Sequence, residues 1–599
     1  MDNLQGFHRS HYCGDLRLDD AGKTVSLCGW VQRQRDLGGL IFVDLRDRTG
    51  LIQLSFDDST DRAIFEKASS LRSEFVVAAV GTVRERESKT SKIATGDIEV
   101  YVTELRLLAK SETPPFEIVE HSKANDMLRL KYRYLDLRRP EMQQAIATRH
   151  KITKIARDYF DENGFLEIET PVLTKSTPEG ARDYLVPSRV HPGKFYALPQ
   201  SPQQYKQLLM LSGFDRYFQI ARCFRDEDLR ADRQPEFTQI DLEMSFVNEE
   251  DIMSIQEGFL KRVFKEVLDV DVQTPFQRMP WQEAMDRFGS DKPDLRFGFE
   301  LKDISDIVKG CGFGVFSSPV QAGGSVRLIN VNGHAADFPR KKIDKLVDFV
   351  KTYRAKGLAW CRLVDGQVTS SYQKFLTQEE NQAILDRAGA KDGDLILIVG
   401  DEKNSVVWAA LGALRCEVAR QLGLLDPKDF KFLWVTQFPM FEWSEEEGRY
   451  QAMHHPFTAP MVEDEDKILS DKANCRARAY DIVLNGTELG GGSIRINTPE
   501  MQEKAFQALG ISEEDIQERF GHLVGAFKFG APPHGGLAYG LDRLCMLMAG
   551  VPSIRDVIAF PKVQNASDLM MACPDFVDDK QLDDLSIAVT RREQDEPEA

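Results

Sequence analysis

The strongest constraint on the fold is a dense cluster of charges between two strand-like arms at residues 218–246. The arms, FQIARCF and FTQIDLEMSF, alternate apolar and polar residues as half-buried strands do. Four arginines and five acids lie within Arg222–Glu236. This pattern predicts an antiparallel pair that presents a charged loop to an anionic ligand, because arginine forms a fork to phosphate. A surface network of salt bridges is the alternative interpretation for part of the set.

Two glycine-rich segments later in the chain, LNGTELGGGSIRI (484–496) and GAPPHGGLAYGLDRLCML (530–547), predict a second part of the same site. Glycine lets a ligand approach the backbone closely. The GLDRL run places Arg543 at the start of an apolar helix, beside amide donors that favour anions. The earlier segment FLEIETPVL (165–173) is predicted to be an alternating strand, with Pro171 serving an interface or a turn.

The N-terminal part is predicted to be a small β-barrel. Five segments within residues 1–108 are rich in Val, Ile, Leu and Phe, with Gly and Asp between them. An OB-fold is one such barrel, and a small β-sandwich is the alternative. A proline linker and the basic run RLKYRYLDLRR (129–139) follow, and a long amphipathic helix is predicted to start at Pro140. The basic run is either a phosphate-contacting hinge or a solvated helix face.

Composition limits the possible classes of protein. At roughly 100–200 residues per domain, 599 residues predict three to five domains. The net charge of −18 argues against a broadly basic nucleic-acid binder, but it leaves room for local basic stripes. The nine cysteines show no CxxC spacing, which argues against a zinc ribbon and fits a reducing compartment. The chain carries no apolar leader and no apolar run long enough for a membrane span, so we expect a cytoplasmic protein without membrane contact.

The three clusters resemble the three signature motifs of class II aminoacyl-tRNA synthetases. Residues 165–173 resemble the dimer-interface motif, Phe224–Glu227 the FRxE motif, and Gly536–Arg543 the glycine motif that ends in arginine. Ala538 departs from that last pattern, which usually has glycine there. TPEGARDYLV (177–186), QSPQQYKQ (200–207), HHPFT (454–458) and the GGGSIR run resemble the aspartate-specific family, and the resemblance covers essentially the whole chain.

The resemblance implies a multidomain α/β and β fold. It has an N-terminal OB-fold anticodon-binding barrel, a class II catalytic domain on an antiparallel sheet with flanking helices, and an inserted α+β domain of bacterial type. The implied boundaries are 1–108 for the barrel, 109–145 for a hinge, 146–287 and 423–562 for the two catalytic parts, 288–422 for the insertion, and 563–599 for a C-terminal extension. A homodimer is also implied.

The implied activity is that of an aspartate–tRNA ligase, which uses ATP and Mg²⁺ to form aspartyl-adenylate and then charges tRNA-Asp with L-aspartate. A related asparaginyl or lysyl enzyme is one alternative, and the Lys206–Arg495 pair and the long insertion argue against it. A catalytically inactive tRNA-binding relative is another, and the intact Arg225, Glu227, Glu488 and Arg543 argue against it. A related asparagine synthetase would lack the barrel.

The resemblance also assigns residues to the substrates. Arg225 and Arg543 are the implied catalytic residues. Aspartate is implied to contact Glu179, Gln203, Lys206, Arg225, Asp241, His454 and Arg495. ATP is implied to contact Arg225, Asp226, Glu227, Gln234, Glu488, Gly540, Leu541, Asp542 and Arg543, with Asp481 and Glu488 as ligands of Mg²⁺. Lys206 and Arg495 suit a carboxylate, because the amide of asparagine would leave their charges unpaired.

The barrel is implied to read the anticodon through Arg35, Phe42 and Gln53. Strictness toward tRNA-Asp is a finer question. Enzymes of the relaxed type, which also charge tRNA-Asn, tend to carry His where this chain has Leu37, and Gly in the later barrel loop where it has Ser88, Lys89 and Thr90. The resemblance therefore predicts a discriminating enzyme, with the relaxed type as the alternative.

Overall fold

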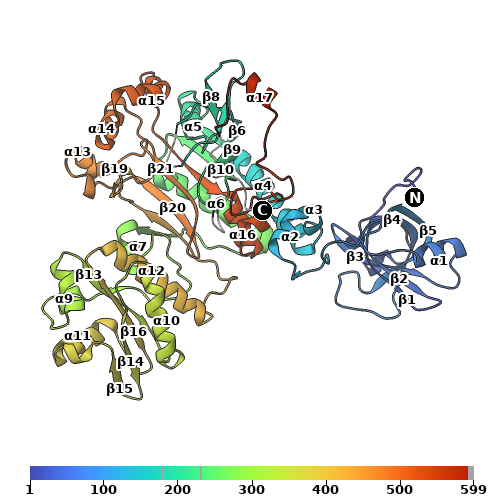
Figure 1. Cartoon of the computed structure of the whole chain (residues 1–599), viewed down its shortest axis with the longest axis horizontal. Coiled ribbons are helices and arrows are strands. Elements are labelled where there is room, and N and C mark those ends of the chain that lie inside the picture. Colours follow the sequence, from blue (N-terminus) through green and yellow to red (C-terminus); the bar gives the residue numbers. More distant parts are fainter. Residues whose placement is uncertain (178–180, 230–232, 591–599) are drawn as a thin grey trace. The chain divides into compact units, whose positions relative to one another are not determined.

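The computed structural model describes residues 1–177, 181–229 and 233–590 (Figure 1). The chain divides into two compact units. The first comprises residues 1–150, 228–234 and 551–578, and the second comprises 151–227, 235–550 and the residues from 579 onward. Among the described residues, no helix combines the length and the hydrophobicity that a membrane span needs.

A closed five-stranded barrel forms the N-terminal part of the first unit, in the order β1-β2-β3-β5-β4. Its pairings are antiparallel except for β3 with β5. Alternate side chains fill the interior, as the sequence pattern predicts for half-buried strands. The OB-fold prediction is therefore confirmed. The elements are β1 (Thr24–Asp36), β2 (Ile41–Asp47), β3 (Gly50–Phe56), α1 (Arg62–Ser69), β4 (Val76–Glu85) and β5 (Ile98–Ala109).

The basic run after the barrel forms two short helices, α2 (Asp126–Lys131) and α3 (Arg133–Asp136). Arg133 and Arg139 are buried, and both pair with the fully buried Asp136. Arg133 also donates hydrogen bonds to the carbonyl oxygens of Arg555, Ile558 and Ala559. These two arginines hold the first unit together, so the prediction of a phosphate-contacting run is wrong for them.

An eight-stranded sheet organises the described part of the second unit, in the order β11-β17-β20-β21-β22-β10-β9-β6. Only the pairs at its two edges, β11 with β17 and β6 with β9, are parallel. The predicted antiparallel pair with a charged loop is present as β9 and β10. The strands are β6 (Leu166–Glu167), β9 (Arg216–Phe224), β10 (Glu236–Ser245), β11 (Gln277–Pro280), β17 (Phe432–Thr436), β20 (Ala479–Leu484), β21 (Thr487–Ile494) and β22 (His534–Gly540).

Two long helices, α4 (Pro140–Glu162) and α6 (Glu249–Leu268), bury the apolar face of this sheet. Phe160 of α4 packs against Phe218 with ring centroids 5.4 Å apart, and Phe259 of α6 packs against Tyr539 at 5.5 Å. Side chains alternate across a strand, so the neighbours of these residues point to the opposite face, where the polar site lies. Shorter elements of the second unit surround this sheet in the sequence: α5 (Gln203–Leu211), α7 (Trp281–Phe288), α13 (Lys467–Ser470), α14 (Pro499–Leu509), α15 (Glu513–Phe527), α16 (Leu541–Ala549), β7 (Leu185–Pro187), β8 (Phe195–Ala197), β18 (Phe441–Ser444) and β19 (Arg449–Ala452).

The segment FLEIETPVL differs from its prediction. Only Leu166 and Glu167 form a strand, because the pairing with β9 ends after two residues. Leu166, Val172 and Leu173 remain about half exposed. The expected strand over residues 165–173 is therefore wrong in extent.

The inserted region contains a separate sheet in the order β12-β13-β16-β14-β15, with helices on both faces (Figure 1). Leu395, Leu397 and Val399 of β16 face a core shared with α10 and α12. Ile396 and Ile398 face a second core shared with α8, α9 and α11. The elements are β12 (Lys302–Asp303), α8 (Ser305–Val308), α9 (Gly314–Gln321), β13 (Ser325–Val331), α10 (Arg340–Lys351), β14 (Ala359–Val364), β15 (Gln367–Ser370), α11 (Gln378–Ala388), β16 (Leu395–Asp401) and α12 (Asn404–Gln421); α17 (Asp579–Asp584) lies near the C-terminus.

Candidate active site

The register of three central strands brings the polar residues to one face of the large sheet. Asp241 and Glu243 of β10 pair with Ala538 and Gly536 of β22. These two residues pair in turn with Gly491 and Ser493 of β21. Because paired residues of antiparallel strands point to the same side, all six share one face.

Glu243 forms the centre of a fully buried ion network. Arg495 donates from Nε and Nη2 to the two carboxylate oxygens of Glu243, at 2.8 and 3.0 Å. Lys206 Nζ lies 3.3 Å from Glu243 Oε2 and donates to Asp241 Oδ1 at 2.6 Å. Burial raises the pKa of Glu243, but the charges of Arg495 and Lys206 outweigh it and lower the pKa to about 2. Glu243 is therefore ionised at neutral pH.

Asp241 and Gln203 offer unused polar atoms in the same region. Burial raises the pKa of Asp241 above its ordinary value, and the charge of Lys206 opposes this. Among the described residues, Asp241 Oδ2 and Gln203 Nε2 are buried and have no hydrogen-bond partner. Buried polar atoms in proteins are normally paired, so these two atoms are available to a polar ligand.

Glycines of β21 and β22 provide room for carboxylates. A Cβ at Gly536 would lie 1.9 Å from Glu243 Oε2, and a Cβ at Gly491 would lie 2.5 Å from Asp481 Oδ1. At Gly540 the nearest atom would be 3.8 Å away, which is ordinary contact. Of these three glycines, only Gly536 and Gly491 are required by the space around them.

His455, which the sequence did not single out, contacts the network directly. Arg495 Nη1 donates to His455 Nε2 at 2.8 Å. Burial, with a further contribution from the charge of Arg495, lowers the pKa of His455 well below its ordinary value. The predicted residue, His454, has its Nε2 3.9 Å from Asp481 Oδ1 and its ring edge against Phe438. His455 is therefore a neutral acceptor that supports Arg495.

Asp481 and Glu488 form an acidic pair across β20 and β21. A register shift between Ile482 and Val483 brings Glu488 opposite Val483, which points to the same side as Asp481. The nearby charge of Asp481, together with burial, raises the pKa of Glu488. Two carboxylates that destabilise each other's charge suit a divalent cation, which relieves their repulsion. The described residues hold no cluster of three or more metal-ligating side chains, and Mg²⁺ in proteins is often held by one or two carboxylates plus substrate phosphates.

Arg543 is positioned by the residue before it. Asp542 is buried and accepts a hydrogen bond from the backbone N–H of Thr238 at 2.9 Å, which fastens the start of α16 to β10. Arg543 Nη1 donates to the carbonyl oxygen of Glu488 at 3.4 Å. Gly540 pairs with Gln239, and the Leu541 side chain lies in the core. The roles predicted for these residues toward ATP stay predictions.

Arg225 follows the last residue of β9, and its guanidinium lies 5.2 Å from the ring centroid of Phe237. Its Nε is buried and without a hydrogen-bond partner among the described residues. Asp226 forms an exposed ion pair with Arg182 at 3.3 Å, and Glu227 is the next residue of the loop. Arg225 is thus held by an aromatic face with a donor left for a ligand.

Gln234 and Glu179 are two further residues predicted for the site. Within the first unit, Gln234 Nε2 donates to the carbonyl oxygen of Lys562 at 3.0 Å, and Gln234 Oε1 accepts from the backbone N–H of Lys562 at 2.7 Å. This arrangement points to a structural role for Gln234. Glu179 lies outside the described residues.

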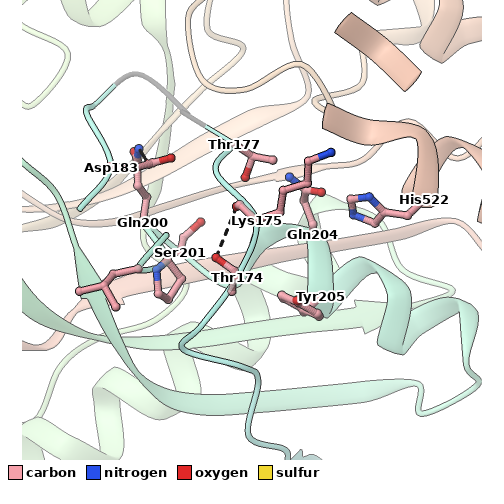
Figure 2. Close-up of a pocket in the computed structure, with 11 residues that line it drawn as sticks. Thr174, Lys175, Thr177, Asp183, Gln200, Ser201, Gln204, Tyr205 and His522 are labelled. Atoms are coloured by element: carbon pink, nitrogen blue, oxygen red, sulfur yellow. Dashed lines mark hydrogen bonds between the residues drawn. The ribbon is translucent and has the colours of Figure 1, made fainter. Parts of the chain in front are cut away.

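A polar pocket lies along α5 (Figure 2). One side of the helix is buried and carries Gln203, Lys206, Gln207 and Met210. Gln204, which is also buried, and Tyr205 line the pocket. Thr174, Ser201 and His522 contribute hydroxyl and imidazole groups to its wall (Figure 2). Burial and the charge of Lys175 lower the pKa of His522. Most of the lining residues are polar, so the pocket suits a polar ligand.

On the barrel, the structure brings the three predicted anticodon residues together. Arg35 Nη2 donates to Gln53 Oε1 at 3.0 Å, and its guanidinium lies 5.6 Å from the Phe42 ring centroid. Gln53 is buried and donates to Glu99 at 2.6 Å. The residues predicted to discriminate between tRNAs, Leu37, Ser88 and Lys89, are all exposed in the loops that follow β1 and β4.

Comparisons with known proteins agree on one family. Residues 125–564 match the model of "tRNA synthetases class II (D, K and N)", and residues 25–108 match that of the "OB-fold nucleic acid binding domain". A Ruminiclostridium cellulolyticum protein named aspartate–tRNA ligase is 61% identical over 593 residues, covering 98% of this chain and 100% of the relative. A Lachnoclostridium phytofermentans protein named aspartate–tRNA(Asp/Asn) ligase is 58% identical over 598 residues, covering 99% and 100%.

Solved structures show the same fold at low identity. The aspartyl-tRNA synthetase of Entamoeba histolytica aligns with a TM-score of 0.57 at 18% identity, covering 93% of this chain and 92% of that one. The asparaginyl-tRNA synthetase of Pyrococcus horikoshii, in complex with asparaginyl-adenylate, aligns with a TM-score of 0.57 at 19% identity, covering 92% and 98%.

Proposed function

The chain belongs to the class II tRNA synthetases of the D, K and N group, and we propose from this that it is an aspartate–tRNA ligase. It activates L-aspartate with ATP to aspartyl-adenylate and transfers the aspartyl group to the 3′ end of tRNA-Asp. The OB-fold barrel binds the anticodon, through Arg35, Phe42 and Gln53.

The observation that carries the choice of aspartate is the charge of the buried network. Lys206, Arg495, Glu243 and Asp241 sum to zero charge, so once Asp241 pairs with the ammonium group of the substrate, one positive charge is left over. This charge offsets the side-chain carboxylate of aspartate. Asp241 offers its unused Oδ2 to the ammonium group, and Arg225 offers its guanidinium to the α-carboxylate. Asparagine would leave one buried positive charge unpaired, which costs several kcal/mol in a site shielded from water.

Catalysis needs no nucleophilic side chain. Arg225 orients the reacting carboxylate and the α-phosphate, and Arg543 contacts the terminal phosphates, so positioning and charge stabilisation lower the barrier. Asp481 and Glu488 would hold Mg²⁺, which when bound offsets the charge of the phosphates. Gln203 and His454 complete the aspartate site.

Pyrophosphate exchange, measured with each of the standard amino acids in turn, tests the proposal. We expect aspartate alone to stimulate strong exchange. Arg225→Ala should abolish exchange and leave tRNA binding largely intact. Exchange driven by asparagine or lysine in place of aspartate would refute the assignment.

Strictness toward tRNA is the finer part of the proposal. Relatives at 57–61% identity carry both names, with and without tRNA-Asn, so identity does not separate the two types. Leu37, Ser88 and Lys89 support the discriminating type. Charging of purified tRNA-Asp and tRNA-Asn transcripts should then differ by more than tenfold, and equal charging of both would establish the relaxed alternative.

A homodimer is the proposed state of assembly, in the cytoplasm. Leu166, Val172 and Leu173 of the first motif leave apolar side chains exposed near an edge of the sheet, and a second copy would cover them. Light scattering should give twice the mass of the chain. A monomer at micromolar concentration would contradict this part of the proposal.

A further inference from the structure

One helix of the inserted domain carries a concentrated positive charge. Residues 340–356, which comprise α10 and the turn after it, contain seven bases and two acids. The rest of the region 288–422 contains 12 bases and 15 acids, and the whole chain has a net charge of −18. Only this segment of the insertion therefore has a net positive charge.

The fold directs these bases to solvent. Ile343, Leu346 and Val350 bury one side of α10 in the core that it shares with α12 and β16. Lys341 and Lys345, one turn apart, and Lys342 beside them are exposed. They form the surface that we call the α10 lysine surface.

Internal pairing does not account for this surface. Arg340, Lys351 and Lys356 pair with Asp344, Asp348 and Glu402. Over the described ranges, by contrast, neither Lys341 nor Lys345 has a carboxylate within ion-pair distance, and Lys342 Nζ lies 5.6 Å from the ring centroid of Phe338.

Helix stability does not account for it either. Some helices of this chain place acids in the first turn, where the helix dipole favours negative charge, as in Glu249–Asp251 of α6 and Glu513–Asp515 of α15, whereas α9 and α12 have neither acids nor lysines there. The first turn of α10 has no acid, and lysines occupy its second, third and sixth positions. These charges oppose the dipole, so they weaken the helix and point to a ligand that compensates them.

We propose that the α10 lysine surface binds the phosphate backbone of the tRNA. This inference rests on the proposed function, which supplies an extended polyanion as the substrate. Lysine acts as a compact point charge toward phosphate and carries no sequence information. The surface therefore adds affinity for tRNA without adding specificity, and the inserted domain gains a role in holding the substrate.

The test compares two triple variants of the full chain. K341Q/K342Q/K345Q removes the surface, and K309Q/K374Q/K391Q removes three exposed lysines elsewhere on the insertion. Glutamine keeps the side-chain stem and the helix propensity. Affinity for tRNA-Asp is measured by fluorescence anisotropy between 50 and 300 mM salt.

Loss of the surface should weaken binding by about tenfold or more at low salt and reduce the slope of log affinity against log salt by about 2, as expected for three phosphate contacts. The control should stay within about twofold of the parent. Aspartate-dependent exchange without tRNA should be unchanged in both variants, and the Tm of the first should not fall. Equal tRNA affinity and salt slope in the two variants would overturn the proposal, whereas absence of exchange in the parent would overturn the proposed function instead.

Discussion

Glu243→Gln is the perturbation that tests the buried network most directly. Glu243 is fully buried, accepts from two nitrogens of Arg495 and lies 3.3 Å from Lys206. The introduced amide keeps the shape and one acceptor oxygen, but it loses the charge and places an N–H donor against two cations. The protein should then hold Arg495 in a different orientation and carry an unbalanced positive charge.

The magnitude follows from the bonds that are lost. A hydrogen bond to a charged group contributes about 1.5–3 kcal/mol. Losing one such bond, together with the orientation of Arg495, should cost about 2–3 kcal/mol. This energy corresponds to a decrease of roughly 30- to 150-fold in kcat/KM for aspartate. The KM for ATP should stay within about twofold, because Arg225, Arg543, Asp481 and Glu488 are unchanged.

Pyrophosphate exchange with varied aspartate and varied ATP measures both quantities. Glu446→Gln is the matched control, because it removes one carboxylate charge from an exposed position. A Glu243→Gln protein whose kcat/KM for aspartate stays within threefold of the parent would refute the reasoning. So would an equal rise in the KM values for aspartate and ATP.

The same variant has a predicted pH dependence. The pKa of Glu243 is lowered from 4.5 to about 2 in the folded chain. Its contribution to stability is therefore fully present above pH 4.5 and is lost as the pH falls toward 2. The difference in Tm between the parent and Glu243→Gln should narrow as the pH is lowered from 5 to 3, and a constant difference would contradict the linkage.

Three further predictions concern other parts of the chain. Gly536→Ala should destabilise the protein by about 1–3 kcal/mol or abolish exchange, because the added Cβ meets Glu243, whereas Gly540→Ala should leave the Tm and exchange close to the parent. Asp481→Asn should lower the pKa of Glu488, because the charge of Asp481 is the main cause that raises it. The same change should raise the Mg²⁺ concentration for half-maximal exchange by about tenfold. An unchanged Mg²⁺ dependence would argue against the acidic pair as the metal site. Phe42→Ala should lower kcat/KM for tRNA by about 5- to 150-fold, with aspartate-dependent exchange unchanged, and charging assays with a tRNA-Asp transcript would show it.

Local patterns predicted most of the fold. The five barrel strands follow the alternating segments within a few residues, and the β9–β10 pair follows the two arms around the charged loop. The β9–β10 pair and three of the barrel pairs join neighbouring strands in the sequence, whereas β1 with β4 and β3 with β5, which close the barrel, do not. The strand at residues 165–173 was predicted too long, because the sequence does not show that its partner β9 pairs with only two of its residues.

The basic run at residues 129–139 shows the limit of reading charge from composition. Five bases and one acid predicted a solvent-facing stripe, yet that one acid, Asp136, is fully buried and binds Arg133 and Arg139. Burial of an acid with two arginines is a tertiary event, and the count of charges does not reveal it.

Glu243 escaped prediction for the same reason, and its case shows which signal was present. Asp241 and Glu243 stand two apart in a strand, so they had to share a face, and a strand that buries two carboxylates needs buried cations. Those cations come from elsewhere: Lys206 from α5 and Arg495 from a position 252 residues further along the chain. The space for Glu243 comes from Gly536, a third segment. Sequence motifs identified the two cations for an assumed contact with substrate, and Gly536 only as the first residue of the glycine motif. The structure adds that the cations and the glycine also serve one carboxylate, so a substitution at any of them should change the affinity for aspartate through Glu243.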